Sequence, residues 1–306
     1  MPTSAAGTGS GPRRAGSLFG RWCCHIRVFR FVPVLEAVLT LVRVTPDDAG
    51  TVGTNVAKEH EMRIVVAGGT GQTGRLLVDA LRERGHEAVP ASPSTGVNAF
   101  TGDGLEQALI GTDVVIDVTN APSTDEAEAT EFFRVSSENL TTAGAKAGVR
   151  HHVVLSIIGL ERASDLAYYR AKLAQEEAVR SGGVPYTIVR AAQFFEFLDV
   201  ILQANTRGGE IALAPLRVQP IALSDLVDHL AVIAESDPVD GIVEAAGPQP
   251  MALDEIGRRL AAPGLDVTSG GRPFFGADIP VDALVAGPSA YLAPTTLESW
   301  LTDRAR

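Results

Sequence analysis

A single glycine-rich run constrains the fold of this chain more than any other feature. The run reads Gly68-Gly69-Thr70-Gly71-Gln72-Thr73-Gly74. Residues 62–67 before it are mostly apolar and include three consecutive β-branched residues, as in a buried parallel strand. Residues 75–85 after it place apolar side chains at helical spacing and end at a glycine. The run therefore joins a strand to a helix, where backbone N–H groups can bind the pyrophosphate of a dinucleotide.

The spacing of the glycines supports this interpretation. Gly69, Gly71 and Gly74 match the G-x-G-x-x-G pattern of dinucleotide-binding turns. Gly68, Gly71 and Gly74 match a variant of that pattern with one more residue between the first two glycines. The alternative is a purely structural turn, but the flanking strand and helix favour a bound dinucleotide. We expect residues 68–74 to contact this cofactor.

The overall charge and the cysteines exclude several classes of protein. The net charge of −11 argues against a nucleic-acid surface, which needs a basic patch. Cys23 and Cys24 are the two cysteines and they are adjacent, so neither a disulfide framework nor a cysteine zinc site is available. The six histidines show no metal-ligand spacing, and we expect no metal. We predict a cytoplasmic location and leave the oligomeric state open.

Residues 1–61 differ in composition from the rest of the chain. They begin with Ser, Gly, Ala and Pro and contain several arginines. The apolar stretch 28–44 is interrupted by charges and a proline, so we expect it not to span a membrane. We predict a poorly ordered extension. It is either a targeting or interaction arm or, as we favour, an upstream stretch included by a misplaced start codon, because Met62 directly precedes the first strand.

Strands and helices alternate from residue 62 to residue 205. This rhythm predicts an α/β protein with a doubly wound parallel sheet, the Rossmann architecture, over 62–205. Shorter elements follow, and we predict a small C-terminal lobe, 206–306, that binds substrate over the carboxyl edge of the sheet. Expected strands are 62–67, 86–91, 113–118, 149–156, 186–190, 210–213 and 241–245, and expected helices are 75–84, 104–110, 123–148, 165–180, 225–235, 253–262 and 296–303.

A serine, a tyrosine and a lysine could carry acid–base chemistry. Ser156 ends an expected strand, and Tyr168 and Lys172 share one face of the next helix, four residues apart. A phenol has an ordinary pKa near ~10, which a nearby ammonium lowers. Such a phenol can exchange a proton with a carbonyl or alcohol oxygen during hydride transfer, and Ser156 could hydrogen-bond that oxygen. The alternative for Tyr168 is a core tyrosine on an amphipathic helix.

In this order the motifs resemble those of the short-chain dehydrogenase/reductase superfamily, over about 62–205. Within it the chain is similar to the atypical NmrA-like group, through the glycine run and the segments 154–159, 168–172 and 186–195. The resemblance implies that Tyr168 protonates or deprotonates the substrate oxygen. It also implies that Lys172 holds the nicotinamide ribose and tunes Tyr168, and that Ser156 orients the substrate.

The chain also departs from the superfamily pattern. Phe132 and Phe133 stand roughly where catalytic members carry an asparagine that anchors a proton-relay water, and we expect Asn139 to support the helix instead. Some NmrA-like proteins bind the dinucleotide without turning it over and act as redox sensors. Tyr169 has no lysine four residues further on, so we expect it to pack in the core.

The end of the second strand bears on the choice of cofactor. A carboxylate there binds the ribose 2′-OH of NAD, but residues 89–94 contain none. Ser92 could instead hydrogen-bond the 2′-phosphate of NADP. No arginine follows the strand, so the sequence favours NADP over NAD only mildly. We expect Thr119 and Asn120, after the third strand, to line the adenine-ribose side, and an ordinary strand-end turn is the alternative.

These observations lead to one main hypothesis and two alternatives. The leading hypothesis is an NAD(P)-dependent oxidoreductase that acts on a small carbonyl or alcohol. The first alternative is a non-catalytic, NADP-binding redox sensor of the NmrA-like type that contacts a partner protein. The second is a sugar-nucleotide or isomerase activity on the same scaffold. Because a fold does not determine function, the sequence leaves the substrate open.

Overall fold

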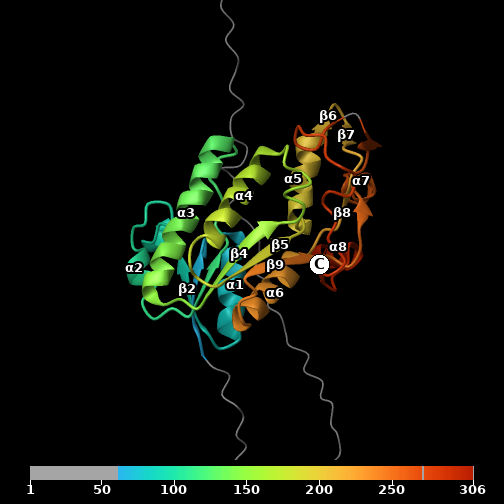
Figure 1. Cartoon of the computed structure of the whole chain (residues 1–306). Helices are drawn as coiled ribbons and strands as arrows, with labels where there is room; N and C mark the ends of the chain where they lie inside the picture. The colour runs from blue at the N-terminus through green and yellow to red at the C-terminus, as the bar shows by residue number, and fades with distance from the viewer. Residues whose placement is uncertain (1–60, 271, 306) are drawn as a thin grey trace, which may run out of the picture. The chain divides into compact units, whose positions relative to one another are not determined.

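The computed structural model describes residues 61–270 and 272–305 (Figure 1). The expectations for the N-terminal extension, apart from Glu61, lie outside the described residues. None of the helices in the described ranges is long and apolar enough to cross a membrane.

A seven-stranded sheet with parallel pairing throughout forms the centre of the fold. Its strand order is β12-β9-β5-β4-β3-β1-β2. The strands are β1 (Arg63–Ala67), β2 (Glu87–Ala91), β3 (Val114–Asp117), β4 (His151–Ile157), β5 (Tyr186–Ala191), β9 (Gly241–Ala246) and β12 (Tyr291–Leu292). The order reverses at β1, whose neighbours are β2 and β3. The predicted doubly wound parallel sheet is thereby confirmed, and sheets of this kind bind ligands where the strand order reverses.

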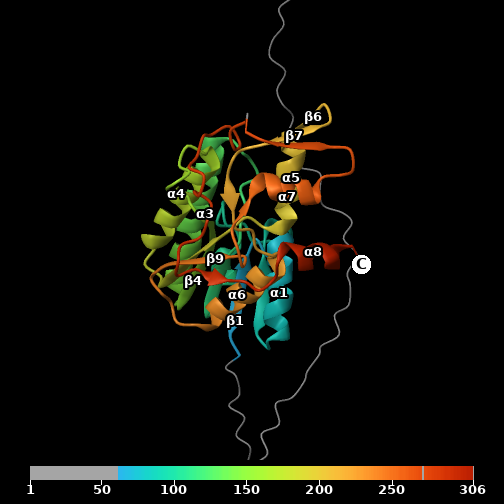
Figure 2. The ribbon, with the colours of Figure 1, turned by 90° about the vertical axis from the view of Figure 1, so that its right-hand side faces the viewer.

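Helices cover both faces of this sheet (Figure 2). On one face α1 (Gln72–Glu83) packs against α6 (Leu223–Glu235), over a core that includes Ile64, Leu77 and Val153. On the other face α3 (Glu126–Ala147) packs against α4 (Ala167–Arg180). The short α2 (Leu105–Ala108) lies in the connection between β2 and β3. Side chains alternate between these two layers along each strand, because successive residues of a strand point to opposite faces.

The residues after β5 build a second apolar cluster and also extend the main sheet. The additional elements are α5 (Phe195–Asn205), β6 (Thr206–Arg207), β7 (Glu210–Leu213), β8 (Arg217–Val218), β10 (Met251–Ala252), α7 (Leu253–Leu260), β11 (Asp266–Ser269) and α8 (Leu297–Arg304). Two small sheets, β11-β7-β6 and β10-β8, belong to this region. Because β9 and β12 lie beyond residue 205 and join the main sheet, the division into two domains at that residue stays a prediction.

Helix α3 begins slightly later than its sequence suggests. The expected start at Ser123 rested on a pairing of Ser123 with Glu126. In the structure Asp125 is the N-cap, and its carboxylate accepts hydrogen bonds from the backbone N–H groups of Ala127 and Glu128. Ser123 Oγ instead accepts from the Asp125 N–H at 3.2 Å. An aspartate side chain at this position satisfies two of the free N–H groups of the first turn.

Candidate cofactor and active site

The glycine run turns sharply from β1 into α1 at the carboxyl edge of the sheet. Gly68 has φ +79°, a conformation that favours glycine, and its N–H donates to Ala91 O at 2.9 Å. Gly71 is the N-cap of α1, and no side chain caps that end. Gln72 and Thr73 form the first residues of the helix. The free N–H groups of this first turn therefore remain available to a phosphate.

Gly74 lets the helix approach the turn more closely than any side chain would allow. A Cβ atom at Gly74 would lie 2.2 Å from Gly68 O and 2.6 Å from Gly69 Cα. At Gly71 the only close atom is Gly68 O, at 3.2 Å. The two glycines thus have different roles: Gly74 is required for packing, whereas Gly71 faces outward at the helix terminus. A cradle of this shape fits the pyrophosphate of a dinucleotide.

Three side chains converge on Thr70, in the middle of the run. Ser92 Oγ accepts from the Thr70 N–H at 3.2 Å and donates to Ala91 O at 2.8 Å. Ser94 Oγ lies 3.4 Å from Thr70 Oγ1. Arg75 Nε donates to Thr70 O at 2.6 Å. Ser92 is therefore engaged in holding the loop, while Ser94 and Arg75 are exposed beside it.

Arg75 is a candidate cofactor ligand that the sequence analysis missed. A basic residue that binds a 2′-phosphate was expected only after β2, whereas this arginine follows the last glycine of the run. Its position in the first turn of α1 was the available signal, because that turn begins at the dinucleotide's phosphates.

The segment after β3 faces the same edge. Asp117, the last residue of β3, is fully buried, and its Oδ1 accepts from the Thr119 N–H at 2.9 Å. Thr119 Oγ1 is buried without a hydrogen-bond partner among the described residues. Asn120 is exposed, and its Oδ1 accepts from the Tyr168 hydroxyl at 2.6 Å. The unsatisfied Thr119 hydroxyl and the glycine cradle both fit a dinucleotide at this edge.

Tyr168 and Lys172 lie four residues apart on α4, with Phe133 of α3 between them. The rings of Phe133 and Tyr168 meet edge to face, with centroids 5.7 Å apart. Lys172 Nζ lies 4.7 Å from the centroid of the Phe133 ring. The ammonium donates to Leu155 O at 2.7 Å and to Gln175 Oε1. Phe133 thus occupies the space beside both candidate catalytic side chains.

Burial dominates the electrostatics of this pair. It raises the pKa of Tyr168 to about 12 and lowers the pKa of Lys172 to about 8, although Asp117 and Glu176 partly oppose the second shift. The i, i+4 spacing of Tyr168 and Lys172 predicted that the ammonium lowers the Tyr168 pKa. That expectation is wrong for this arrangement, because the ammonium turns towards Leu155 and Gln175.

Ser156 faces the interior between β4 and α4. Its hydroxyl donates to Glu176 Oε1 at 2.6 Å, and the same oxygen accepts from Arg190 Nε at 2.8 Å. Arg180 and Arg190 also donate to the other oxygen of this fully buried carboxylate. The structure therefore places the Ser156 hydroxyl in a buried ion network and does not bring it to Tyr168. A catalytic role for Ser156 stays a prediction.

Replacing Ser156 with alanine tests whether Ser156 stabilises the buried ion network. Because the buried Glu176 carboxylate would lose one of its donors, we expect the free energy of unfolding to fall by about 2 kcal/mol. NADPH affinity should remain at the wild-type value. Chemical denaturation and calorimetric titration with NADPH measure the two quantities. Unchanged stability would contradict the structural role.

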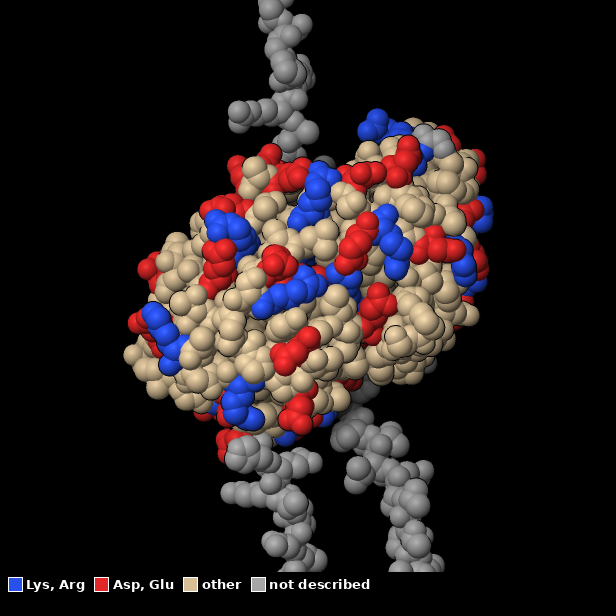
Figure 3. All heavy atoms as spheres, in the orientation of Figure 1, with Lys and Arg blue, Asp and Glu red and all other residues tan. Residues whose placement is uncertain are grey.

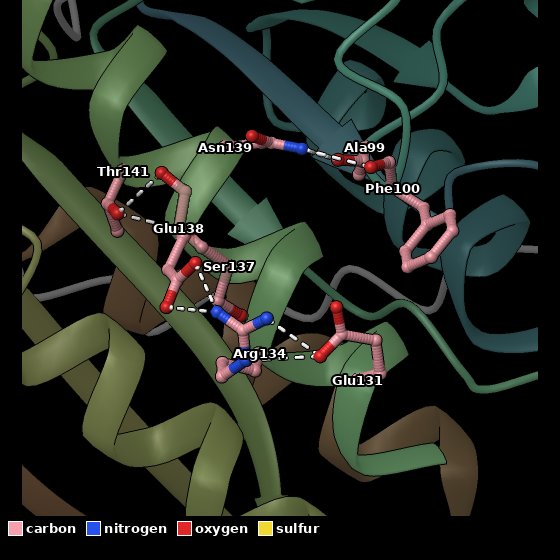
Figure 4. Close-up of polar contacts among 8 residues, drawn as sticks. All are labelled: Ala99, Phe100, Glu131, Arg134, Ser137, Glu138, Asn139 and Thr141. Atoms are coloured by element: carbon pink, nitrogen blue, oxygen red, sulfur yellow. Dashed lines mark hydrogen bonds and ion pairs between the residues drawn. The ribbon is translucent and has the colours of Figure 1, made fainter. Parts of the chain in front are cut away.

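Asn139 connects α3 to the loop before α2 (Figure 4). Its Nδ2 donates to Ala99 O at 2.9 Å and to Phe100 O at 3.0 Å. The Phe100 ring stacks on Phe132 with centroids 5.7 Å apart. Asn139 therefore supports a neighbouring loop and lies apart from the proton chemistry. On the same helix, Arg134 bonds two glutamates on the exposed surface (Figure 4).

Acidic and basic side chains are interspersed on the molecular face drawn in Figure 3. That the partner is a small molecule stays a prediction.

Comparisons with known proteins identify relatives that include a reductase. A (4-alkanoyl-5-oxo-2,5-dihydrofuran-3-yl)methyl phosphate reductase from Streptomyces griseus is 28% identical over 261 residues, which cover 79% of this chain and 86% of the reductase. A photosystem II assembly factor from Synechocystis is 28% identical over 151 residues, but the match spans only 46% of that protein.

Solved structures with low sequence identity share the fold. A dTDP-4-dehydrorhamnose reductase from Bacillus anthracis, in complex with NADP, superimposes with a TM-score of 0.63 at 14% identity, covering 77% of this chain and 95% of the reductase. The enzyme WbmG from Bordetella bronchiseptica, in complex with NAD, has a TM-score of 0.63 at 18% identity, covering 82% and 94%.

The fold and the glycine turn define a Rossmann-type dinucleotide-binding protein. Residues 68–199 match a family model described as NAD(P)H-binding. Over these residues the chain carries an NAD(P)H-binding domain, which agrees with the predicted resemblance to the atypical short-chain dehydrogenase/reductase group. The reductase from Streptomyces griseus agrees with the prediction of an NAD(P)-dependent oxidoreductase.

Proposed function

We propose that this protein is an NmrA-like, NADP-dependent reductase that acts on a small carbonyl compound. The observation that carries the proposal is the Tyr168 hydroxyl, which lies with Asn120 at the same sheet edge as the glycine turn. A bound nicotinamide cofactor would supply the hydride. Residues 68–74, Thr119 and Lys172 would hold it. A cytoplasmic location belongs to the same proposal.

The protonation state of Tyr168 favours reduction over oxidation. With a pKa raised to about 12 by burial, the phenol keeps its proton at neutral pH. It can then donate that proton to a carbonyl oxygen as the neighbouring carbon receives hydride. Asn120 Oδ1 accepts a hydrogen bond from the phenol hydroxyl, with the two oxygens 2.6 Å apart, and so orients the hydroxyl before a substrate replaces Asn120 as its partner.

The relative from Streptomyces griseus supports a substrate with a conjugated carbonyl. Its name specifies an alkanoyl group and an oxo group on a dihydrofuran ring. The decisive experiment is a titration of the purified protein with NADPH, followed by a substrate panel of aldehydes, ketones and acyl dihydrofuranones. Consumption of NADPH with any of these classes supports a reductase.

A second function, that of an NADP-binding sensor without turnover, has one specific observation in its favour. Phe133 is a hydrocarbon ring in contact with both Tyr168 and Lys172, so it can relay no proton to either. A protein that binds NADPH tightly and consumes none with the whole panel would favour the sensor.

We expect Arg75 to contribute to a preference for NADPH over NADH. Its guanidinium lies beside Thr70, whose hydroxyl faces Ser94, and this is where a 2′-phosphate would meet the end of β2. An arginine binds phosphate by charge-assisted hydrogen bonds. Arg75→Gln should weaken NADPH binding about tenfold, or about 1.4 kcal/mol, and leave NADH binding unchanged.

Arg82→Gln is the matched control for this prediction. Arg82 lies on the same helix, but its guanidinium donates to Ala88 O, away from the glycine run. Calorimetric titration with both cofactors provides the comparison. An equal loss of NADPH and NADH affinity in Arg75→Gln would show that Arg75 only supports the loop.

A further inference from the structure

The Lys172 ammonium is buried and needs a compensating charge. Only 4% of the residue is exposed. Its two hydrogen-bond acceptors, Leu155 O and Gln175 Oε1, are both uncharged, and the Phe133 ring covers another side. A buried charge is stable only when it is paired and hydrogen-bonded. A negatively charged group must therefore lie close to Lys172.

Gln175 connects Lys172 to that charge. The glutamine is fully buried, and its Nε2 donates to Asp117 Oδ2 at 2.9 Å. An ammonium can only donate hydrogen bonds and a carboxylate can only accept them, whereas a carboxamide does both. A glutamine between the two groups therefore has one allowed orientation, with its oxygen towards Lys172 and its nitrogen towards Asp117.

The same carboxylate also holds the segment that follows β3. Asp117 Oδ1 accepts from the Thr119 N–H at 2.9 Å, and this fixes the backbone that leads into Asn120. Asn120 in turn accepts from the Tyr168 hydroxyl. The buried Asp117 carboxylate is thus linked to Lys172 by the Gln175 side chain. It is linked to Tyr168 by the turn at Thr119 and by Asn120.

We propose that Asp117 and Gln175 are positioning residues for the candidate catalytic pair. Asp117 provides the negative charge that keeps the Lys172 ammonium in place. Gln175 links the two groups, because its amide accepts a hydrogen bond from Lys172 and donates one to Asp117. Their role in catalysis rests on the proposed function, whereas their effect on Lys172 does not require any turnover.

The charged groups around Lys172 determine the sign of the expected effect. Burial lowers the pKa of Lys172 to about 8, and Asp117 on β3 and Glu176 on α4 both raise it. From β4, His152 faces Asp117, and burial lowers the pKa of this histidine, which favours its neutral form. Removing the Asp117 charge, or the Gln175 amide that accepts a hydrogen bond from the ammonium, should therefore lower the Lys172 pKa further.

The lysine content of the chain makes this pKa directly measurable. The sequence contains three lysines, Lys58, Lys146 and Lys172. Nuclear magnetic resonance titration of the full chain with isotope-labelled lysine side chains therefore yields few signals, which Lys→Arg variants assign. We expect Asp117→Asn and Gln175→Met each to lower the Lys172 pKa by about one unit or more, a tenfold change in the protonation equilibrium.

The control variant is Glu177→Gln, which removes an exposed carboxylate from the same helix. It should leave the Lys172 pKa at its wild-type value, and Lys146 should titrate identically in all variants. Gln175→Met keeps the proposal testable if Asp117→Asn fails to fold, because it leaves the carboxylate and its bond to Thr119 in place. A Lys172 pKa that is equal in the wild type and in the folded variants would overturn the proposal.

This titration needs neither cofactor nor substrate. A failure to bind NADPH would therefore reject the proposed function and leave the support of Lys172 by Asp117 unaffected. Conversely, an unchanged Lys172 pKa would reject the positioning role while the protein still reduced a carbonyl compound.

Discussion

Replacing Gly71 with aspartate is expected to abolish dinucleotide binding and leave the fold intact. Gly71 has φ −74° and ψ −179°, which any residue adopts, and a Cβ there meets only Gly68 O, at 3.2 Å. Aspartate is a favoured N-cap residue, and the end of α1 has no side-chain cap. The new carboxylate would satisfy the N–H groups that the pyrophosphate needs and would also repel it.

The expected loss of affinity is large. Two unit charges 4 Å apart repel by roughly 4 kcal/mol at an effective dielectric constant of about 20. We therefore expect NADPH binding to weaken at least about 100-fold in a calorimetric titration, which is about 2.7 kcal/mol. The melting temperature should equal or exceed the wild-type value.

Gly71→Ser is the matched control, because serine caps a helix without a charge. We expect it to keep most of the NADPH affinity. If Gly71→Asp bound NADPH like the wild type, the glycine run would be only a turn. If Gly71→Ser lost as much affinity as Gly71→Asp, the loss would be steric, and the electrostatic explanation would be wrong.

Replacing Tyr168 with phenylalanine is expected to remove most of the turnover of a carbonyl substrate and to spare cofactor affinity. The phenol acts on the substrate oxygen, so its loss affects the chemical step. A general acid contributes typically about 10²- to 10⁴-fold. Its present partner, Asn120, is exposed and can bond to water instead, so stability should change little. Steady-state kinetics and NADPH titration measure the two effects.

Tyr169→Phe is the internal control for this prediction. The Tyr169 hydroxyl accepts from Gln193 Nε2 at 3.3 Å in the interior, away from Asn120. We expect near-normal turnover and a stability loss of about 1 kcal/mol. A Tyr168→Phe variant that turns substrate over at the wild-type rate would refute the acid–base role of Tyr168.

Local patterns in the sequence predicted every strand of the main sheet except β12, and every α-helix except α5. β7 spans the expected residues 210–213, and α4 begins two residues later than expected and ends at the expected residue. The apolar periodicity of a strand or helix indicates which of its faces is buried. This pattern can be recognised without knowing which other element packs on that face. The strands β6, β8, β10 and β12 were missed, because two residues carry no periodicity, and the longer elements β11 and α5 were missed as well.

The candidate site was predictable only where a motif specifies backbone geometry. By itself, the sequence determined that the run 68–74 connects a strand to a helix and that Tyr168 and Lys172 share a helix face. Both follow from contacts within a few residues of the chain.

Only the tertiary structure decided which partners the polar side chains take. It directed Ser156 to Glu176, brought Arg75 to Thr70, and joined Lys172 to Asp117 through Gln175. In the first and third cases residues on different strands and helices meet across the interior. There a buried polar group must bond to whichever neighbour the packing supplies, and no local pattern in the sequence encodes that neighbour.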